Sequence, residues 1–166
     1  FPSVDGVMNM HARRILLNFA TGKVSGRQTG ALLNRMVQDA GIENILKSWI
    51  LLDNHDTPRL LHEMPDEKLR RLAQILQFTV PGSPNLYYGT ELGMNGGEDP
   101  EQRAPMRWDL VTSENAELTA VKKLIAMRRG SPALRYGDFL ILDSEKAFAF
   151  MRKTDLVSET AIVVAN

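Results

Sequence analysis

Residues 49–56 read WILLDNHD, a short apolar run followed at once by four polar side chains. Periodicity alone does not separate such a run from a buried helical turn, but its shortness favours a buried parallel strand. In parallel α/β folds, functional side chains gather at the ends of strands and in the loops that follow them. We therefore expect residues 53–56 to stand at the mouth of a site.

Strand-like and helical segments alternate on both sides of this stretch. Before it we predict a short buried strand at 4–10, a helix at 11–19, a glycine-rich loop at 22–30 and a helix at 32–40 that stops at Gly41. After it we predict a helix opened by Pro65, a strand at 85–88, a long loop at 93–105 and a helix capped by Ser113 or Asn115. Such alternation is typical of parallel βαβ units.

The pattern changes after Pro132. Three short β-type runs follow, at 139–142, 147–151 and 161–164, with turn residues between them. These runs predict the start of an antiparallel β module over residues 132–166, distinct from an α/β part over residues 1–131. The last run stops near Asn166, so we expect it to lack a pairing partner. Because Phe1 is not an initiator Met, we also expect the chain to be a piece of a longer protein.

The bulk composition excludes several classes of function. The 166 residues contain 20 Lys and Arg against 20 Asp and Glu, so no net charge draws the chain toward nucleic acid or a membrane surface. There is no cysteine, which rules out disulfides and thiolate metal sites, and no apolar stretch approaches the roughly 20 residues that cross a bilayer. The carboxylates at 97–99 lack the spacing of a calcium loop. We expect no metal and no cofactor, and the composition predicts no compartment.

On their own, residues 53–56 leave two interpretations open. In the functional one, they line a site at the end of a strand. In the ordinary structural one, Asp53 or Asp56 caps the next helix, and His55 is a hydrogen-bonded residue near the surface.

Longer stretches carry a family resemblance. Residues 51–59, LLDNHDTPR, resemble the fourth sequence motif of the α-amylase family, glycoside hydrolase family thirteen. Residues 78–94, FTVPGSPNLYYGTELGM, resemble that family's strand-eight motif, G-x-P-x-x-x-Y-G-x-E. Residues 96–108, GGEDPEQRAPMRW, look like the following loop in neopullulanase, cyclomaltodextrinase and maltogenic-amylase relatives. Residues 5–9 resemble strand six, and residues 128–139 the passage into the C-terminal β-sandwich, so the matches run in family order.

The resemblance implies a fold. Residues 1–131 would be the C-terminal portion of a TIM (β/α)8 barrel, comprising strands six to eight with their helices. Residues 132–166 would begin an antiparallel β-sandwich domain.

The resemblance also implies a chemistry, that of a retaining hydrolase or transglycosylase acting on starch-type α-glucans, maltooligosaccharides or cyclodextrins. Retention needs a nucleophilic carboxylate and a carboxylic acid about 5 Å apart. Asp56 would be the family's third carboxylate, which stabilises the transition state, and His55 would hydrogen-bond sugar hydroxyls. The other substrate-binding candidates are Asn54, Arg59, Asp99 and Arg103. For each of Arg59, Asp99 and Arg103, a surface charge or a loop salt bridge is the ordinary alternative.

The family motifs that carry the nucleophile Asp and the acid Glu do not occur in this sequence. We therefore expect the chain alone to be inactive, and to be completed by the missing part of the barrel or by a second copy. The alternative function is a non-catalytic amylase-like scaffold or glycan-binding module, although the presence of both His55 and Asp56 favours an enzyme. A nucleotide-binding α/β protein is disfavoured, because neither G-x-x-x-x-G-K-[ST] nor G-x-G-x-x-G follows a strand.

Overall fold

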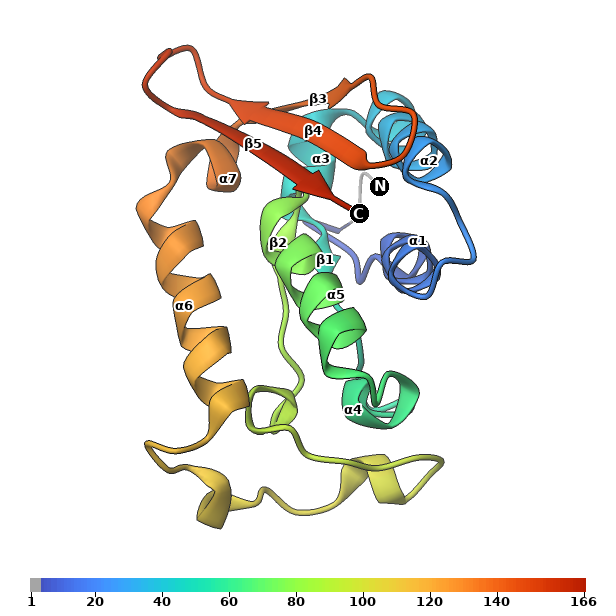
Figure 1. Ribbon diagram of the computed structural model, residues 1–166, viewed down its shortest axis with the longest axis vertical. Coiled ribbons are helices and arrows are strands. Elements are labelled where there is room, and N and C mark those ends of the chain that lie inside the picture. The colour runs from blue at the N-terminus through green and yellow to red at the C-terminus, as the bar shows by residue number, and fades with distance from the viewer. Residues whose placement is uncertain (1–3) are drawn as a thin grey trace.

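A computed structural model describes residues 4–166 of the chain (Figure 1). Its helices are α1 (Met10–Ala20), α2 (Gly26–Ala40), α3 (Ile42–Lys47), α4 (Leu60–Glu63), α5 (Glu67–Thr79), α6 (Ala116–Gly130) and α7 (Pro132–Tyr136). Its strands are β1 (Trp49–Ile50), β2 (Ser83–Pro84), β3 (Asp138–Leu142), β4 (Phe148–Lys153) and β5 (Thr160–Ala165). Short 3-10 turns, η1 (Thr90–Leu92), η2 (Glu101–Arg103) and η3 (Trp108–Leu110), lie between β2 and α6. Within residues 4–166, no helix has both the length and the hydrophobicity that a membrane span requires.

Three parallel segments lie side by side in the α/β part. β1 pairs with β2 in parallel, with Trp49 opposite Ser83, and Met8 forms a parallel bridge to Trp49 on the other side of β1. Leu51 and Leu52 continue β1 and are almost completely buried. Of the predicted buried strand at 49–52, only Trp49–Ile50 is a strand; residues 50–52 are buried, Trp49 is 51% exposed, and none of the four residues is helical.

The two neighbours of β1 differ from prediction. The segment 4–10 is not a buried strand, because it makes a single bridge and leaves Val4 52% and Met8 46% exposed. No described strand covers its other edge. The partner on the opposite side is Ser83–Pro84 and not 85–88, because pairing starts as soon as Gly82 has made its turn at φ +124°.

The helices follow the predicted amphipathic pattern but start at different residues. α2 begins at Gly26, so the predicted loop at 22–30 is wrong for its second half. Ser25 and Gln28 form a reciprocal capping box there, which satisfies the first free amides of the helix. α5 is capped by Asp66 rather than opened by Pro65, and of the two candidates for α6 it is Asn115 that caps.

Gly26 makes the contact between α2 and the β module. A Cβ at this position would lie 2.3 Å from both Ala147 C and Phe148 N. Gly→Ala within a helix ordinarily stabilises by about 0.5–1 kcal/mol, but here the methyl group would push α2 off β4. We expect Gly26→Ala to lower the free energy of unfolding by about 1–3 kcal/mol, measured by chemical denaturation.

Gly130 is the matched control, because it also ends a helix but a Cβ there would meet nothing within 4 Å. Gly130→Ala should be neutral or slightly stabilising. Equal effects of the two substitutions would contradict this account of the α2–β4 contact.

The C-terminal strands form the predicted antiparallel sheet, in the order β3-β4-β5. The expectation that the last run lacks a partner is wrong, because β5 pairs with β4 from Thr160 opposite Lys153 to Ala165 opposite Phe148. The sheet lies at one end of the molecule and the segment around η2 and η3 lies at the other (Figure 1).

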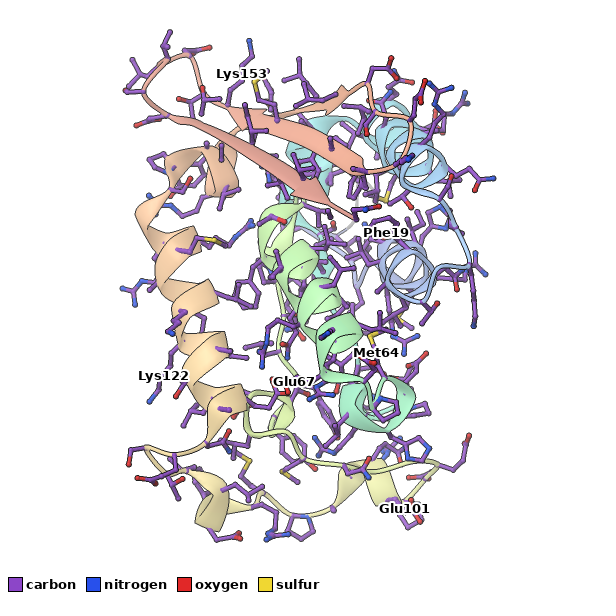
Figure 2. The ribbon with its side chains drawn as sticks, viewed as in Figure 1. Phe19, Met64, Glu67, Glu101, Lys122 and Lys153 are labelled. Atoms are coloured by element: carbon purple, nitrogen blue, oxygen red, sulfur yellow. The ribbon has the colours of Figure 1, made fainter. Side chains whose placement is uncertain are left out.

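One hydrophobic cluster joins the sheet to the helices. Phe148 of β4 meets Phe19 of α1 edge to face, with ring centroids 5.7 Å apart, and Phe139 and Phe150 belong to the same cluster as Leu16, Leu33 and Leu76. Figure 2 shows Phe19 among the side chains that fill this space. The two predicted parts, residues 1–131 and 132–166, thus share one hydrophobic core, and the division between them stays a prediction. Residues 1–3 of the first part lie outside the described residues.

Candidate functional site

The chain passes from core to surface between residues 52 and 56. Leu52 and Asp53 are each 1% exposed and Asn54 is 6% exposed. The side chains of His55 and Asp56 are 52% and 62% exposed. β1 and its extension therefore deliver His55 and Asp56 to the surface at the point where the strand ends.

Asn54 shapes the turn that carries Asp56. Its Oδ1 accepts a hydrogen bond from Asp56 N at 2.9 Å, and its own N–H donates to Thr57 Oγ1 at 3.1 Å. Short polar side chains commonly hold turns in this way. The side-chain amide oxygen of Asn54 is thus occupied by a hydrogen bond within the loop. The residue itself is buried next to the exposed Asp56.

Asp53 anchors the base of the same loop. Its Oδ2 accepts hydrogen bonds from Leu60 N at 2.8 Å and from Thr90 Oγ1 at 2.7 Å. Leu60 is the first residue of α4, so Asp53 accepts the first amide of the next helix, although the N-cap residue of that helix is Arg59. Burial raises the pKa of Asp53 above its usual range, against the opposing effect of its two hydrogen bonds and of Arg59.

Asp56 lies within an array of charged side chains. Its Oδ1 is 3.2 Å from Arg103 Nη2 and its Oδ2 is 3.3 Å from His55 Nε2. Arg103 Nε also donates to the His55 carbonyl oxygen at 3.0 Å and lies 3.2 Å from Asp99 Oδ1. Four of the predicted site residues, His55, Asp56, Asp99 and Arg103, therefore meet on one exposed surface. The loop salt bridge considered for Asp99 and Arg103 is present, and it extends to Asp56.

Arg59 lies beneath this surface and is 0% exposed. Its Nη1 donates to the Tyr88 carbonyl oxygen at 2.7 Å, and its guanidinium carbon is 4.7 Å from the ring centroids of both Tyr87 and Tyr88. Its Nε and Nη2 have no hydrogen-bond partner among the described residues. The surface charge considered for Arg59 is thus wrong, and a direct contact with a ligand would require the tyrosines to move. In this arrangement Arg59 joins the loop after β1 to the segment after β2.

Two residues that support the site were not singled out from the sequence. Gln102 is 3% exposed and its Nε2 donates to the His55 carbonyl oxygen at 3.1 Å. Thr90 is 6% exposed and binds Asp53 as described above. Gln102 directly precedes Arg103, which is a weak signal, and Thr90 lies within the strand-eight match at 78–94, where nothing marked it apart from its neighbours.

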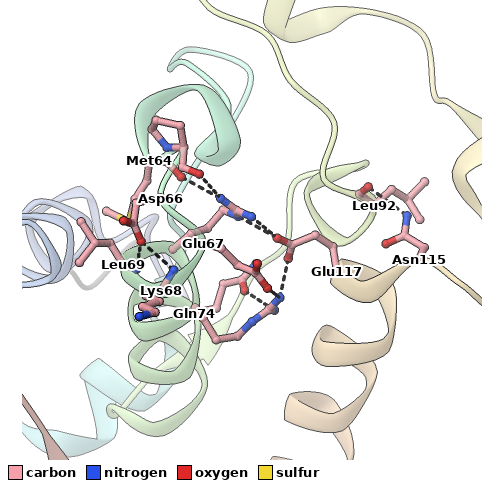
Figure 3. Close-up of polar contacts among 12 residues, drawn as sticks. Met64, Asp66, Glu67, Lys68, Leu69, Gln74, Leu92, Asn115 and Glu117 are labelled. Carbon is pink, nitrogen blue, oxygen red and sulfur yellow. Dashed lines mark hydrogen bonds and ion pairs between the residues drawn. The ribbon is translucent and has the colours of Figure 1, made fainter.

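An ion-pair network joins α5 and α6 (Figure 3). Glu117 Oε1 accepts from Arg70 Nε and Nη2 at 2.8 and 2.6 Å, and Glu117 Oε2 lies 3.2 Å from Arg71 Nη2. Arg70 Nη1 also donates to the carbonyl oxygens of Met64 and Pro65, each at 3.0 Å. These contacts fix the start of α6 against the start of α5.

A separate hollow lies away from Asp56. A groove of about 860 Å³ runs between residues 4–11, α2 and α3, and Asp56 does not line it. The described residues around Asp56 form an open surface, as expected of one wall of a cleft. In the described part of the chain, no group of three His, Asp or Glu side chains is arranged to hold a metal ion.

Comparison with known proteins extends these observations. Residues 17–131 match the Alpha-amylase family, described as the alpha amylase catalytic domain. The chain is 46% identical to a cyclomaltodextrinase of Geobacillus thermopakistaniensis over 98% of its length, and 33% identical to neopullulanase 2 of Thermoactinomyces vulgaris over 89%. It covers 28% and 26%, respectively, of those relatives.

Solved structures are similar over almost the whole chain. The cyclic α-maltosyl-(1→6)-maltose hydrolase of Arthrobacter globiformis, in complex with cyclic α-maltosyl-(1→6)-maltose, superposes with a TM-score of 0.88 at 29% identity, covering 97% of this chain and 37% of that one. A cyclomaltodextrinase superposes with a TM-score of 0.85 at 32% identity, covering 96% of this chain and 28% of that one.

Proposed function

Because the chain belongs to the α-amylase family and forms part of its TIM barrel, we propose that it supplies the transition-state-stabilising carboxylate, Asp56, of a retaining α-glucan hydrolase or transglycosylase. The observation that carries this proposal is the position of Asp56. Its carboxylate stands exposed in the turn at residues 55–56, six residues after the end of parallel strand β1, and contacts Arg103 and His55.

The chemistry follows from that position. Glycosidic cleavage passes through an oxocarbenium-like transition state, in which positive charge develops on the sugar. A carboxylate already held in place stabilises that charge without having to reorganise during the reaction. The exposed His55, Asp99 and Arg103 are proposed to hydrogen-bond sugar hydroxyls beside it. Asn54 and Arg59, which are buried, are proposed to serve the subsite by holding its loops.

The relatives indicate the class of substrate. Solved neighbours hold maltose and cyclic α-maltosyl-(1→6)-maltose, and the similar curated proteins include cyclomaltodextrinases. We propose that maltooligosaccharides or cyclodextrins are the substrates here. Bidentate donors such as Arg103 and acceptors such as Asp99 suit the paired hydroxyls of glucose units.

The nucleophile and the acid belong to family motifs that this sequence does not contain, so the chain by itself is proposed to be inactive. A non-catalytic scaffold is the second candidate, since fold alone does not determine activity. The presence of both His55 and Asp56 on the open surface favours the enzyme.

Assays on the chain and on the enzyme proposed to contain it test this proposal. Reducing-sugar release from β-cyclodextrin and maltohexaose should be at the buffer rate with the chain alone and clearly above it with the complete enzyme. The first products should have the α configuration by proton NMR, because retention preserves the anomer. Turnover by the isolated chain, or β products, would contradict the proposal, and an inert complete enzyme would favour the scaffold.

A further inference from the structure

A buried hydrogen-bonded pair links the two loops of the site. Asp53 Oδ2 receives the backbone N–H of Leu60 at 2.8 Å and the hydroxyl of Thr90 at 2.7 Å. The first bond closes the loop 53–60 at its base. The second ties that base to η1, the turn that follows β2.

Neither member of the pair can touch a ligand, since Asp53 is 1% and Thr90 6% exposed. Between the ends of the loop that Asp53 closes lies Asp56, whose backbone N–H is held by Asn54 at 2.9 Å. At the tip of the same loop, the His55 carbonyl oxygen accepts a hydrogen bond at 3.0 Å from Nε of Arg103, which belongs to η2. The loop is thus fixed at its base by Asp53 and Thr90 and at its tip by Arg103, and a shift at the base moves Asp56 relative to Arg103.

The choice of a carboxylate at the base is informative. Burial raises the pKa of Asp53, so its charged form is costly in the folded chain. The neutral amide of Asn has an oxygen of the same size that accepts both hydrogen bonds without this cost. Hydrogen bonds to an ionised acceptor are shorter and stronger than those to a neutral one. A carboxylate therefore holds the loop more tightly than an amide, at the expense of stability.

We propose that Asp53 and Thr90 are positioning residues, which act through the loop 53–60 to hold Asp56 at the place where it stabilises the transition state. This inference rests on the proposed function of Asp56. It concerns two buried side chains that do not contact the sugar.

The test uses Asp53→Asn, Thr90→Val and Thr90→Ser in the complete enzyme, with kcat and KM measured on maltohexaose and the melting temperature measured alongside. Displacement of a catalytic group by a fraction of an ångström to an ångström costs about 10- to 100-fold in rate. Asp53→Asn should lower kcat by about tenfold, with little change in KM and an equal or higher melting temperature. Thr90→Val should lower kcat similarly, and Thr90→Ser, which restores the hydroxyl, should recover most of it.

A purely structural role would make activity and melting temperature fall together, so the opposite signs expected for Asp53→Asn separate the two roles. Wild-type kcat in Asp53→Asn overturns the inference, and so does a Thr90→Ser variant as slow as Thr90→Val. If Asp53→Asn does not fold, the Thr90 pair decides by itself. Asp56→Asn run in parallel keeps the two proposals apart. Loss of activity in Asp56→Asn beside wild-type rates in the other variants refutes only the positioning role, whereas wild-type turnover in Asp56→Asn refutes the proposed function.

Discussion

Asp56→Asn is expected to lower kcat of the complete enzyme on maltooligosaccharides and cyclodextrins by about a thousandfold. Asn has the same size, and its amide oxygen can still accept the hydrogen bond from Arg103 that Asp56 Oδ1 receives at 3.2 Å. What it lacks is the negative charge. An oxocarbenium-like transition state loses the anion that faces it, while the neutral ground-state sugar loses little, so the effect falls on kcat more than on KM.

The control is Asp143→Asn, which makes the same chemical change at the opposite end of the molecule. Asp143 belongs to the β module, its side chain is 93% exposed, and it pairs with Arg27 of α2. Its replacement should leave kcat, KM and the melting temperature unchanged, because exposed ion pairs contribute little. Titration of the Asp56→Asn protein with maltohexaose should still show binding, so that loss of turnover is not loss of folding. Wild-type turnover by Asp56→Asn would refute the role assigned to this carboxylate.

The sequence predicted the placement of residues 53–56 because the relevant signal there is local. An apolar run that ends in polar residues indicates a buried strand whose following residues reach the surface, and the side chains of His55 and Asp56 after β1 are indeed exposed. The order of the family motifs supplied the longer-range information. It linked the loop with Asp99 and Arg103 to residues more than 40 positions earlier, and the structure has Arg103 in contact with Asp56.

The sequence-based expectations were wrong where contacts between distant segments determine burial or the start of a helix. For Arg59 the sequence left a subsite residue and a surface charge open, and the surface charge is wrong because Tyr87 and Tyr88, which follow β2, lie against its guanidinium. Three glycines suggested a loop, but two of them lie in α2, where Gly26 allows close approach to β4. Which side chains lie below a loop and which lie on it depends on elements far away in sequence, and periodicity carries no such information.

Replacement of Arg152 by Met is the prediction with the largest expected effect on stability. Arg152 is 0% exposed and donates to the carbonyl oxygens of Thr79, Gly137 and Asp138 at 2.9, 2.8 and 3.0 Å. Met fills a similar volume without donors, so two buried carbonyl groups and one part-buried carbonyl group lose their partner. We expect the free energy of unfolding to fall by about 3 kcal/mol and the melting temperature to fall by about 10 °C, measured by circular dichroism on the purified chain.

Removal of a buried charge also relieves a desolvation cost, and this opposes the loss. Apolar replacement is neutral or stabilising when both partners of a buried polar pair are replaced, but here the carbonyl groups remain in the core. The loss of hydrogen bonds should therefore outweigh the relieved desolvation, and Arg152→Met should be destabilising. Arg129→Met on the exposed side of α6 is the matched control and should change stability by less than about 0.5 kcal/mol. Arg152→Lys should fall between the two, because one ammonium group cannot reach three carbonyl groups that a planar fork satisfies. A chain that tolerates Arg152→Met as well as Arg129→Met would show that the end of α5 and the start of β3 are held together by apolar packing rather than by this guanidinium.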